Sequence, residues 1–401
     1  MKNLSVLICT CVDFTKLSAA RNRLLRMSRS LSLLNIDCKI ISISTSAIIG
    51  NYELNEKVLH YKVGDRYKNK IWSILPKSLK HSLICRTFYK KNLTSIVSEN
   101  NTDIIIGYTY LSIVGSMLLN KCREIEIPIV FDLVENFNIK IHYLLNGVNI
   151  QQQIFYSKYL KYSSGVICIS PSWSEWANRK QLPNVYISSF FPDRSLIIDS
   201  RLNQKDSLEL VFMGNLISRE LIIKIFSAIK LCKNKGLTIN MKIIGTNKMG
   251  YRQWPAILYL KFFSKISKHV TFLGFLEDSE KDIALSNADV FILLRKDDKE
   301  TMYSFPTRVP EYLSYGKPLI LSKSNYLSSI FEHHKDIFFI SKENKAEELS
   351  EQLYFIYQNK SFAKDVGIAS YDKASVIFSS SNFGRALSNF LSLLVDDRQR
   401  K

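Results

Sequence analysis

Residues 305–318 place a hydroxyl, a guanidinium and a carboxylate within five positions, a combination suited to a phosphorylated ligand. Their order is Phe-Pro-Thr-Arg-Val-Pro-Glu-Tyr-Leu-Ser-Tyr-Gly-Lys-Pro. It predicts a helix of about ten residues that starts close to Pro310, because proline is tolerated only in the first turn. Backbone N–H groups near Thr307 and Arg308 would then hold an anion, and the planar guanidinium of Arg308 matches a diphosphate.

Glu311 follows Arg308 by three residues, so the two side chains lie on the same face of the predicted helix. A carboxylate beside a phosphate-binding helix start can accept two hydrogen bonds from the ribose hydroxyls of a nucleotide. The same spacing also suits a surface ion pair between Arg308 and Glu311, which would contribute less than about 1 kcal/mol to stability. Spacing alone favours the ion pair.

The elements that must position this segment follow an α/β pattern. In the first half of the chain, short apolar runs alternate with longer amphipathic segments, which predicts parallel strands connected by helices. The predicted strands are residues 4–12, 39–43, 102–106, 127–133 and 165–169, and the predicted helices include 18–34 and 113–122.

The second half repeats the pattern after a polar linker at residues 190–205. Three predicted strands end in glycine, at Gly214, Gly245 and Gly274, which indicates either a close approach of the backbone to a ligand or ordinary turns. Ligands of such sheets bind beyond the carboxyl ends of the strands, here in a cleft between two domains. The predicted strands are 208–213, 240–244, 270–273, 290–294, 318–321 and 337–340, and the predicted domains are 1–195 and 206–378, followed by a helix within 379–401.

Residues 305–318 also resemble a known donor-binding signature, F-P-[ST]-[KR]-x-x-E-Y-x-x-x-G-K-P. This signature is found in GT-B glycosyltransferases of the group 1 type, which resemble the retaining glycosyltransferases of family four. Residues 287–295 resemble the strand that precedes this signature. The resemblance implies an α/β protein with the GT-B fold: two Rossmann-like parallel-sheet domains that face an interdomain cleft, with a C-terminal helix crossing back onto the N-terminal domain. The positions that match in register are Phe305, Pro306, Thr307, Arg308, Glu311, Tyr312, Gly316, Lys317 and Pro318.

The resemblance also assigns donor-binding roles. Glu311 falls on the glutamate that binds the nucleotide ribose, and residues 210–215 followed by Arg219 resemble the loop that contacts the diphosphate. The chain departs from the family at Asn215, where a basic residue is usual, and at Tyr303, where the family has a second glutamate. The candidate donor-binding residues are Glu311, Arg308, Thr307, Gly214, Asn215, Arg219, Arg295, Tyr303 and Pro306.

Residues 127–135 resemble the strand end that faces the acceptor in this family. Asp132 and Glu135 are the candidate catalytic or acceptor-orienting residues, because they are expected where the strand gives way to a loop. Two alternatives stay open: Asp132 caps the following helix, and Glu135 is a solvated loop charge.

The implied reaction moves one sugar from a nucleoside diphosphate-sugar to a glycan, with retention of the anomeric configuration. Backbone amides, Arg308 and Arg219 would stabilise the negative charge of the departing nucleoside diphosphate. No Asp-x-Asp metal signature stands in a suitable loop, and Asp297 and Asp298 resemble a surface pair flanked by lysines. We therefore expect no cofactor and no obligatory metal.

The net charge of +19, from 55 Lys and Arg against 36 Asp and Glu, indicates a polyanionic partner. Residues 66–91 contain basic and apolar residues, including Trp72, without any acid, a composition typical of a membrane interface. The alternative is an amphipathic domain helix with a solvated basic face. The candidate membrane contacts are Trp72, Lys77, Lys80 and Arg86, and a second such stretch, 251–268, combines Trp254, Tyr259, Phe262 and Phe263 with Lys261, Lys265 and Lys268.

Three further features of the sequence argue against a metal-binding, nucleic-acid-binding or membrane-spanning protein. The seven cysteines lack metal-ligand spacing and suit reduced core thiols. No nucleic-acid-binding motif occurs, so we expect no nucleic-acid partner. No apolar run of about 18 residues occurs, and Asp13 interrupts the first apolar run, so we expect neither a membrane span nor a signal peptide.

We interpret the chain as a cytoplasmic glycosyltransferase, peripheral at the inner face of the cell membrane. Its acceptor would be lipid-linked or a polysaccharide, and its pathway would be bacterial surface polysaccharide synthesis, such as capsule or O-antigen. Two alternatives remain. A nucleotide-sugar epimerase also uses two such domains, although the six histidines lack a suitable setting for it. A degenerate binding subunit would account for Tyr303 and Asn215.

Overall fold

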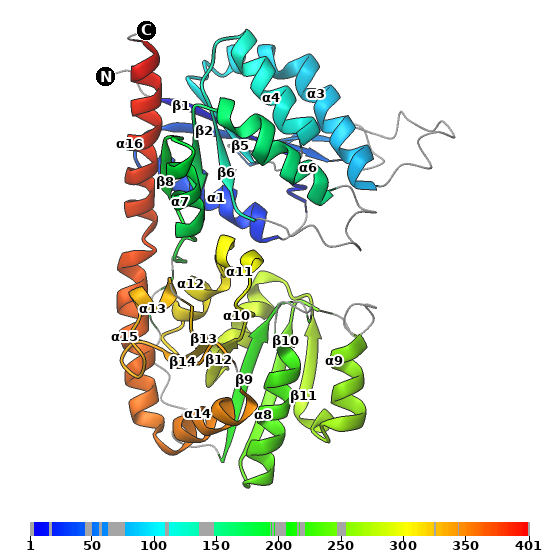
Figure 1. The fold of residues 1–401 in the computed structure, drawn as a ribbon, viewed down its shortest axis with the longest axis vertical. Helices are drawn as coiled ribbons and strands as arrows, with labels where there is room; N and C mark the ends of the chain where they lie inside the picture. The colour runs from blue at the N-terminus through cyan, green and yellow to red at the C-terminus, as the bar shows by residue number, and fades with distance from the viewer. Residues whose placement is uncertain are drawn as a thin grey trace. The chain divides into compact units, whose positions relative to one another are not determined.

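The computed structural model of the 401-residue chain divides into two compact units (Figure 1). Unit 1 consists of Met1–Phe190, Met302–Phe305 and Ser379–Lys401, and unit 2 of Phe191–Thr301 and Pro306–Phe378. The structure describes residues 4–15, 18–44, 50–55, 58–62, 77–108, 112–135, 148–192, 194, 196, 206–214, 216, 221–246, 254–324, 326–343 and 345–399.

Unit 1 is built on a sheet with the strand order β3-β4-β2-β1-β5-β6-β7-β8. Among the described strands of this sheet, only β3 and β4 pair antiparallel, and this hairpin was not predicted from the sequence. The apolar runs form central strands because both faces of a parallel sheet are covered by helices. The strands are β1 (Ser5–Thr10), β2 (Asp37–Ser44), β3 (Gly50–Asn55), β4 (Val58–Lys62), β5 (Ile104–Tyr108), β6 (Ile129–Leu133), β7 (Gly165–Cys168) and β8 (Asn184–Tyr186).

The helices of unit 1 cover this sheet on both faces (Figure 1). The first helix begins after Ser18, whose hydroxyl accepts a hydrogen bond from the Arg21 N–H, as expected of an N-cap serine. The helices are α1 (Ala19–Ser32), α3 (Lys77–Glu99), α4 (Ser112–Glu124), α6 (Val148–Ile154), α7 (Pro171–Arg179) and α16 (Ser380–Gln399), with short π- and 3₁₀-helical turns at Phe155–Tyr159 and Leu160–Tyr162.

The C-terminal helix α16 belongs to unit 1, although the helix before it, α15 (Lys360–Ile377), belongs to unit 2. It packs against α1, and at Gly384 the two helices come so close that a Cβ atom would collide with the backbone of Ser30. Phe390 and Leu394 of α16 lie against Gly165 at the start of β7. The end of the chain thus returns to the N-terminal unit.

Unit 2 contains a wholly parallel sheet with the strand order β11-β10-β9-β12-β13-β14. Its strands are β9 (Ser207–Met213), β10 (Thr238–Ile244), β11 (Val270–Gly274), β12 (Val290–Leu293), β13 (Leu319–Ser322) and β14 (Phe338–Ile340). Its helices are α8 (Ile222–Asn234), α9 (Trp254–Leu258), α10 (Asp278–Ser286), α11 (Lys299–Tyr303, which ends in unit 1), α12 (Arg308–Leu313), α13 (Leu327–Ile330), α14 (Ala346–Gln358) and α15, with π- and 3₁₀-helical turns η5 (Tyr259–Phe263) and η6 (Ser267–His269).

The prediction of two parallel-sheet α/β domains is confirmed, and each predicted strand named above overlaps an observed one. All seven cysteines are free thiols, and all except Cys11 are buried. No helix in the described part of the chain is long and apolar enough to cross a membrane.

Candidate active site

The carboxyl edge of the unit 2 sheet is formed in part by three neighbouring strand ends, each followed or closed by a glycine. The N–H of Gly214 donates to the Ile244 carbonyl at 2.8 Å, and the N–H of Gly245 donates to the Gly274 carbonyl at 2.6 Å. These bonds tie the ends of β9, β10 and β11 together. Gly214 has a φ of +146°, and a Cβ atom there would collide with the guanidinium of Arg308. Only glycine permits this close approach without displacing the arginine.

Arg308 is the first residue of α12, and its guanidinium is held at the end of β9. Its Nη1 donates to the Met213 carbonyl, and the guanidinium carbon lies 5.7 Å from the centroid of the Phe212 ring. The arginine is thus fixed where the parallel strands end, which is the usual ligand position in such sheets.

The helix that carries Arg308 is shorter than predicted. It has six residues instead of about ten, because the chain turns at its end and reaches Gly316 with a φ of +62°. The N-cap Thr307 is itself in the αR region and makes no capping bond with its side chain. The Val309 N–H donates to the Pro306 carbonyl. The Val309 amide is therefore already paired, and the expectation that amides near Thr307 and Arg308 hold an anion stays a prediction.

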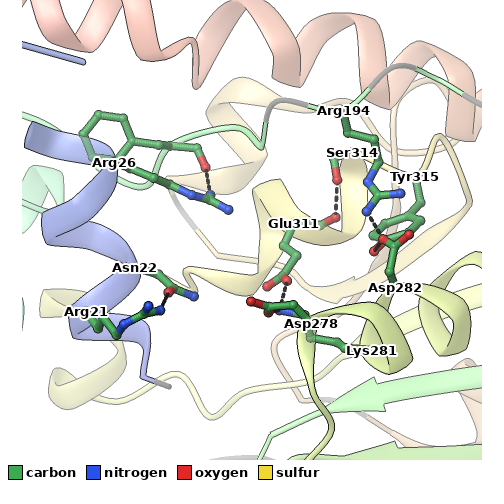
Figure 2. Close-up of polar contacts among 11 residues, drawn as sticks. Arg21, Asn22, Arg26, Arg194, Asp278, Lys281, Asp282, Glu311, Ser314 and Tyr315 are labelled. Atoms are coloured by element: carbon green, nitrogen blue, oxygen red, sulfur yellow. Dashed lines mark hydrogen bonds and ion pairs between the residues drawn. The ribbon is translucent and has the colours of Figure 1, made fainter. Parts of the chain in front are cut away.

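Glu311 lies on α12, three residues after Arg308, with 24% of its side chain exposed. The ion pair that the structure records for it is with Lys281 of α10, whose Nζ lies 3.2 Å from Glu311 Oε1 (Figure 2). Lys281 also pairs with Asp278 at 3.0 Å. Burial alone would lower the pKa of Lys281, but the two carboxylates outweigh it and raise the pKa. Sequence reasoning missed this lysine, although the Asp278–Lys281 spacing of three residues was a signal.

The two tyrosines of the signature segment hold α12 in place. Tyr312 is buried, accepts a hydrogen bond from the Met213 N–H at 2.6 Å and stacks on Phe291. Tyr315 donates to Asp282 at 2.7 Å (Figure 2). Burial raises the pKa of Tyr315 to about 12, so it is a protonated donor at neutral pH. Tyr312 and Tyr315 therefore support the helix that presents Arg308.

The segment that enters unit 2 is anchored beside the same helix. Arg194 pairs with Asp282, and its guanidinium lies 4.1 Å from the centroid of the Tyr315 ring (Figure 2). Its carbonyl accepts a hydrogen bond from Tyr371. This arginine lies in the segment predicted as a linker, and no pattern around it indicated these contacts.

Lys317 has a structural role. It is buried, and its Nζ donates to the carbonyls of Ser286 and Ala288 at the end of α10. A lysine at this position satisfies carbonyls that a helix end leaves unpaired. Lys317 thus holds the end of α10, the helix that carries Lys281.

The remaining predicted donor-binding residues fall in three different settings. Arg295 is buried just after β12, and its N–H donates to the Ser322 hydroxyl at 2.8 Å. Asn215 and Arg219 lie outside the described residues. Tyr303 belongs to unit 1, where its ring packs edge-on against Trp173 and its carbonyl accepts a bond from Ser170. Tyr303 thus lies in unit 1 and Glu311 in unit 2, and the assignment of Tyr303 to the donor site stays a prediction.

Asp132 in unit 1 lies within β6, not in the loop after it. Its carboxylate has no exposed area, and its two oxygens accept bonds of 2.7 and 2.8 Å from Arg23 of α1. Arg23 also donates to the carbonyls of Ile187 and Ser188. Burial would lower the pKa of Arg23, but Asp132 outweighs it and raises the pKa. This geometry corrects the expectation that Asp132 faces the acceptor, because the carboxylate ties α1 to the strand.

Glu135 lies two residues beyond β6 and is half-buried. Its carbonyl accepts hydrogen bonds from Gln152 Nε2 at 3.0 Å and from the Tyr156 hydroxyl at 2.9 Å. The backbone at the strand end is thus fixed by α6 and the π-helical turn that follows it. Glu135 stays the candidate acceptor-orienting residue.

The basic segment 66–91 falls only partly in the described residues. Trp72 and the side chain of Lys77 lie outside them. In α3, Arg86 is exposed and Lys80 is half-buried, whereas the apolar side chains of Ile84 and Tyr89 are buried in unit 1. Tyr89 donates to the Thr10 carbonyl at 2.9 Å. Ile84 and Tyr89 thus belong to the core of unit 1, so a membrane could contact only the basic face of this part of α3.

We searched the described residues for a metal centre and found no group of three His, Cys, Asp or Glu side chains that could hold one. The expectation of a metal-independent reaction stays a prediction.

Part of the chain matches a known protein family. Residues 193–373 match the model of the family described as glycosyl transferases group 1, and this range contains Gly214, Lys281, Arg308 and Glu311. No curated protein matches the chain at a significant level of sequence similarity.

Solved structures share the fold over nearly the whole chain at low identity. Sucrose-phosphate synthase from Thermosynechococcus elongatus has a TM-score of 0.73 at 11% identity and covers 98% of this chain and 100% of its own. A glycosyltransferase from Rickettsia africae has a TM-score of 0.71 at 14% identity, covering 98% and 99%. The Anabaena protein HepE in complex with UDP and glucose has a TM-score of 0.69 at 12% identity, covering 97% and 100%. The chain therefore has the GT-B fold and carries a group 1 glycosyltransferase domain in unit 2, and the protein is a glycosyltransferase enzyme.

Proposed function

We propose that the protein transfers a sugar from a nucleoside diphosphate-sugar to a lipid-linked or polysaccharide acceptor at the cytoplasmic face of the membrane. The pathway would be the assembly of a bacterial surface polysaccharide such as capsule or O-antigen. The donor assignment rests on one observation. Arg308 donates a hydrogen bond to the Met213 carbonyl at the end of β9, and Glu311 lies on the same short helix.

In this proposal, Arg308 contacts the diphosphate. Its guanidinium lies against Gly214, where the absence of a side chain lets the cation reach the end of β9. As the bond from the anomeric carbon to the diphosphate breaks, the electron pair remains on the departing oxygen. A cation already held in place stabilises that charge without reorganisation, which is the main electrostatic contribution to such catalysis.

Glu311 binds the ribose hydroxyls in this proposal, and the ion pair with Lys281 orients its carboxylate. The crystallised complexes of HepE with UDP and with UDP-glucose support a donor of this chemical class for a chain of the same fold. We propose retention of configuration and a reaction without a metal or cofactor.

On the acceptor side, Glu135 orients the acceptor hydroxyl, and Asp132 acts as a positioning residue through Arg23. An anionic membrane surface is the proposed location of the acceptor. The charge of +19 and the exposed Arg86 on α3 support this partner, and we propose peripheral attachment there.

Calorimetric titration with UDP, GDP, CMP and ADP tests the donor assignment. We expect one of these nucleotides to bind the wild-type protein and Glu311→Ala to abolish its binding. Glu343→Ala is the matched control, because Glu343 is an exposed residue of unit 2 that pairs with Lys345. Wild-type affinity in Glu311→Ala would show that the site is wrongly assigned. If none of the nucleotides bound the wild-type protein, the degenerate binding subunit would become the better description.

A further inference from the structure

Unit 2 exposes a cluster of large apolar side chains on α9 and η5. The exposed fractions are 61% for Trp254, 45% for Leu258, 70% for Phe262 and 64% for Phe263. The first three follow one another at intervals of four residues, so they form a stripe along one side of the helix. A cluster of this kind on a soluble domain marks a surface that contacts a partner.

The opposite side of the same helix is already packed into the domain. Ala256, Leu260 and Ile266 are buried, and the Tyr259 hydroxyl lies 2.7 Å from the Ser227 hydroxyl of α8. The helix is therefore apolar on both sides, but only one side has a protein partner among the described residues. A helix that is apolar all round is expected to be covered on every side, either by protein or by lipid.

Two lysines of α8 fasten the end of this segment. Lys230 Nζ donates to the Phe263 carbonyl at 3.1 Å, and Lys233 Nζ donates to the Lys265 carbonyl at 3.2 Å. The aromatic side chains are thus presented on a fixed backbone, and little ordering would be needed when they meet a partner.

The stretch of sequence that carries the cluster has charged residues of one sign only. Residues 221–276 contain no Asp or Glu, and Lys261, Lys265 and Lys268 beside the aromatic side chains are exposed. A surface with this composition matches an anionic partner. The basic residues of this range are Lys224, Lys230, Lys233, Lys235, Lys242, Lys248, Arg252, Lys261, Lys265 and Lys268.

We propose that Trp254, Leu258, Phe262 and Phe263, with Lys261, Lys265 and Lys268, form a membrane-contact surface that inserts into the interface of an anionic bilayer. This inference deepens the membrane part of the proposed function and rests on it. Tryptophan and phenylalanine enter the boundary between headgroups and acyl chains, while lysine stems extend toward the phosphates. Leu258 suits acyl chains better than bases, and the sequence has no nucleic-acid-binding motif, which is why lipid is favoured over nucleic acid.

Sedimentation with vesicles tests this proposal. We would measure binding of the full chain to phosphatidylcholine vesicles with and without 30% phosphatidylglycerol. Wild-type protein should bind only the anionic vesicles. Lys261→Gln, Lys265→Gln and Lys268→Gln together should weaken the partition coefficient by about 100-fold, because each basic residue near an anionic surface contributes about fivefold. Trp254→Ser, Phe262→Ser and Phe263→Ser together should weaken it by at least about tenfold.

Matched controls change the same chemistry elsewhere. Lys335→Gln, Lys342→Gln and Lys345→Gln remove three exposed lysines of unit 2 outside this surface and should leave the partition coefficient within about twofold of wild type. Bromine-labelled lipid should quench the fluorescence of Trp254 in the wild type, and Trp254→Phe should lose that quenching. Nucleotide calorimetry on each variant reports the donor site independently.

Several results would overturn the inference. Wild-type vesicle binding by the aromatic variant would do so, and would direct attention to the Lys77, Lys80 and Arg86 charges of unit 1. Binding of the wild type to RNA or DNA instead of vesicles would do so as well. In either case, nucleotide binding that is lost in Glu311→Ala would leave the donor assignment standing.

Discussion

Replacing Asp132 by asparagine distinguishes a carboxylate that supports unit 1 from one that acts on the substrate. Asparagine has nearly the same shape but no charge, so it removes the ion pair with Arg23 and leaves the packing. In the structure, the side chain of Arg23 is 4% exposed and that of Asp132 is fully buried. A neutral residue at position 132 would therefore leave a buried guanidinium without its counter-ion.

The size of the effect follows from this burial. Removing one partner of a buried ion pair costs about 3–5 kcal/mol. Asparagine keeps one oxygen that can accept from Arg23, and the carbonyls of Ile187 and Ser188 still accept two other bonds, so we expect the lower end, about 3 kcal/mol. With a urea dependence of about 2 kcal/mol per M, the unfolding midpoint of unit 1 should fall by about 1.5 M.

Hydrogen exchange during a urea series is the suitable assay, because peptides from α1 and β6 report unit 1 separately from unit 2. Asp397→Asn, an exposed residue of α16, is the control and should not move the midpoint. The double variant Arg23→Met with Asp132→Leu should recover part of the loss, since no unpaired charge then remains. Glycosyl transfer should fall only as far as the folded fraction does.

The opposite pattern would refute this reasoning. If Asp132→Asn shifted the midpoint by less than about 0.3 M, equal to about 0.6 kcal/mol, the buried pair would not stabilise unit 1 as argued. If transfer nevertheless fell at least about 100-fold, Asp132 would be catalytic, as the sequence alone predicted.

Three further predictions follow from named contacts. Gly214→Ala should weaken nucleotide binding by at least about tenfold in calorimetry, because the new Cβ displaces the Arg308 guanidinium. Gly236→Ala is the control, because Gly236 also has a positive φ but faces open space, and it should not weaken binding. Equal binding by both variants would contradict the Arg308 assignment. Burial raises the pKa of Cys122 and Cys168 to about 12, so these thiols should react with a thiol reagent at pH 8 only after unfolding; rapid labelling of either in the native protein would show that it is accessible. His333 accepts a bond from the Phe339 N–H, and burial lowers the pKa of His333, so the native state favours the neutral ring. The neutral ring therefore stabilises unit 2 above the unfolded pKa of about 6.5, and this stabilisation is lost as the pH falls below that value. His333→Asn should flatten the pH dependence of the unit 2 urea midpoint between pH 7.5 and 5.5. An unchanged slope would exclude His333 as the source of that pH dependence.

Much of the fold could be predicted because its signals are local. The runs that became β1 and β12 are almost wholly apolar, and such runs occur where both faces of a parallel sheet are covered. The other predicted strands followed from the same pattern, whereas β3, β4 and β8 were missed. The length of α12 could not be predicted, since its end depends on the packing of Gly316 against Leu196 and of the adjoining turn against Gly367 of α15.

The candidate site was predicted only where one segment carries it. Arg308 and Glu311 lie three residues apart, so their shared helix was visible in the sequence. The partner of Asp132 is 109 residues away at Arg23, and Glu311 pairs with Lys281 across two helices. A charge has many possible partners in a chain with 55 basic residues, and only the fold selects one.

The same distinction separates the two basic segments. Both 66–91 and 251–268 mix aromatic residues with lysines and contain no acid, and the predicted membrane contacts were placed in the first, with the second as a further stretch of the same kind. In α3, Tyr89 is buried and donates to the Thr10 carbonyl, so this aromatic residue belongs to the core of unit 1. In α9 and η5, Ala256 and Leu260 occupy the inward positions, which leaves Trp254, Phe262 and Phe263 on the outside. Composition shows that a segment is apolar on both of its sides, but only the packing shows whether the protein covers both sides or leaves one exposed.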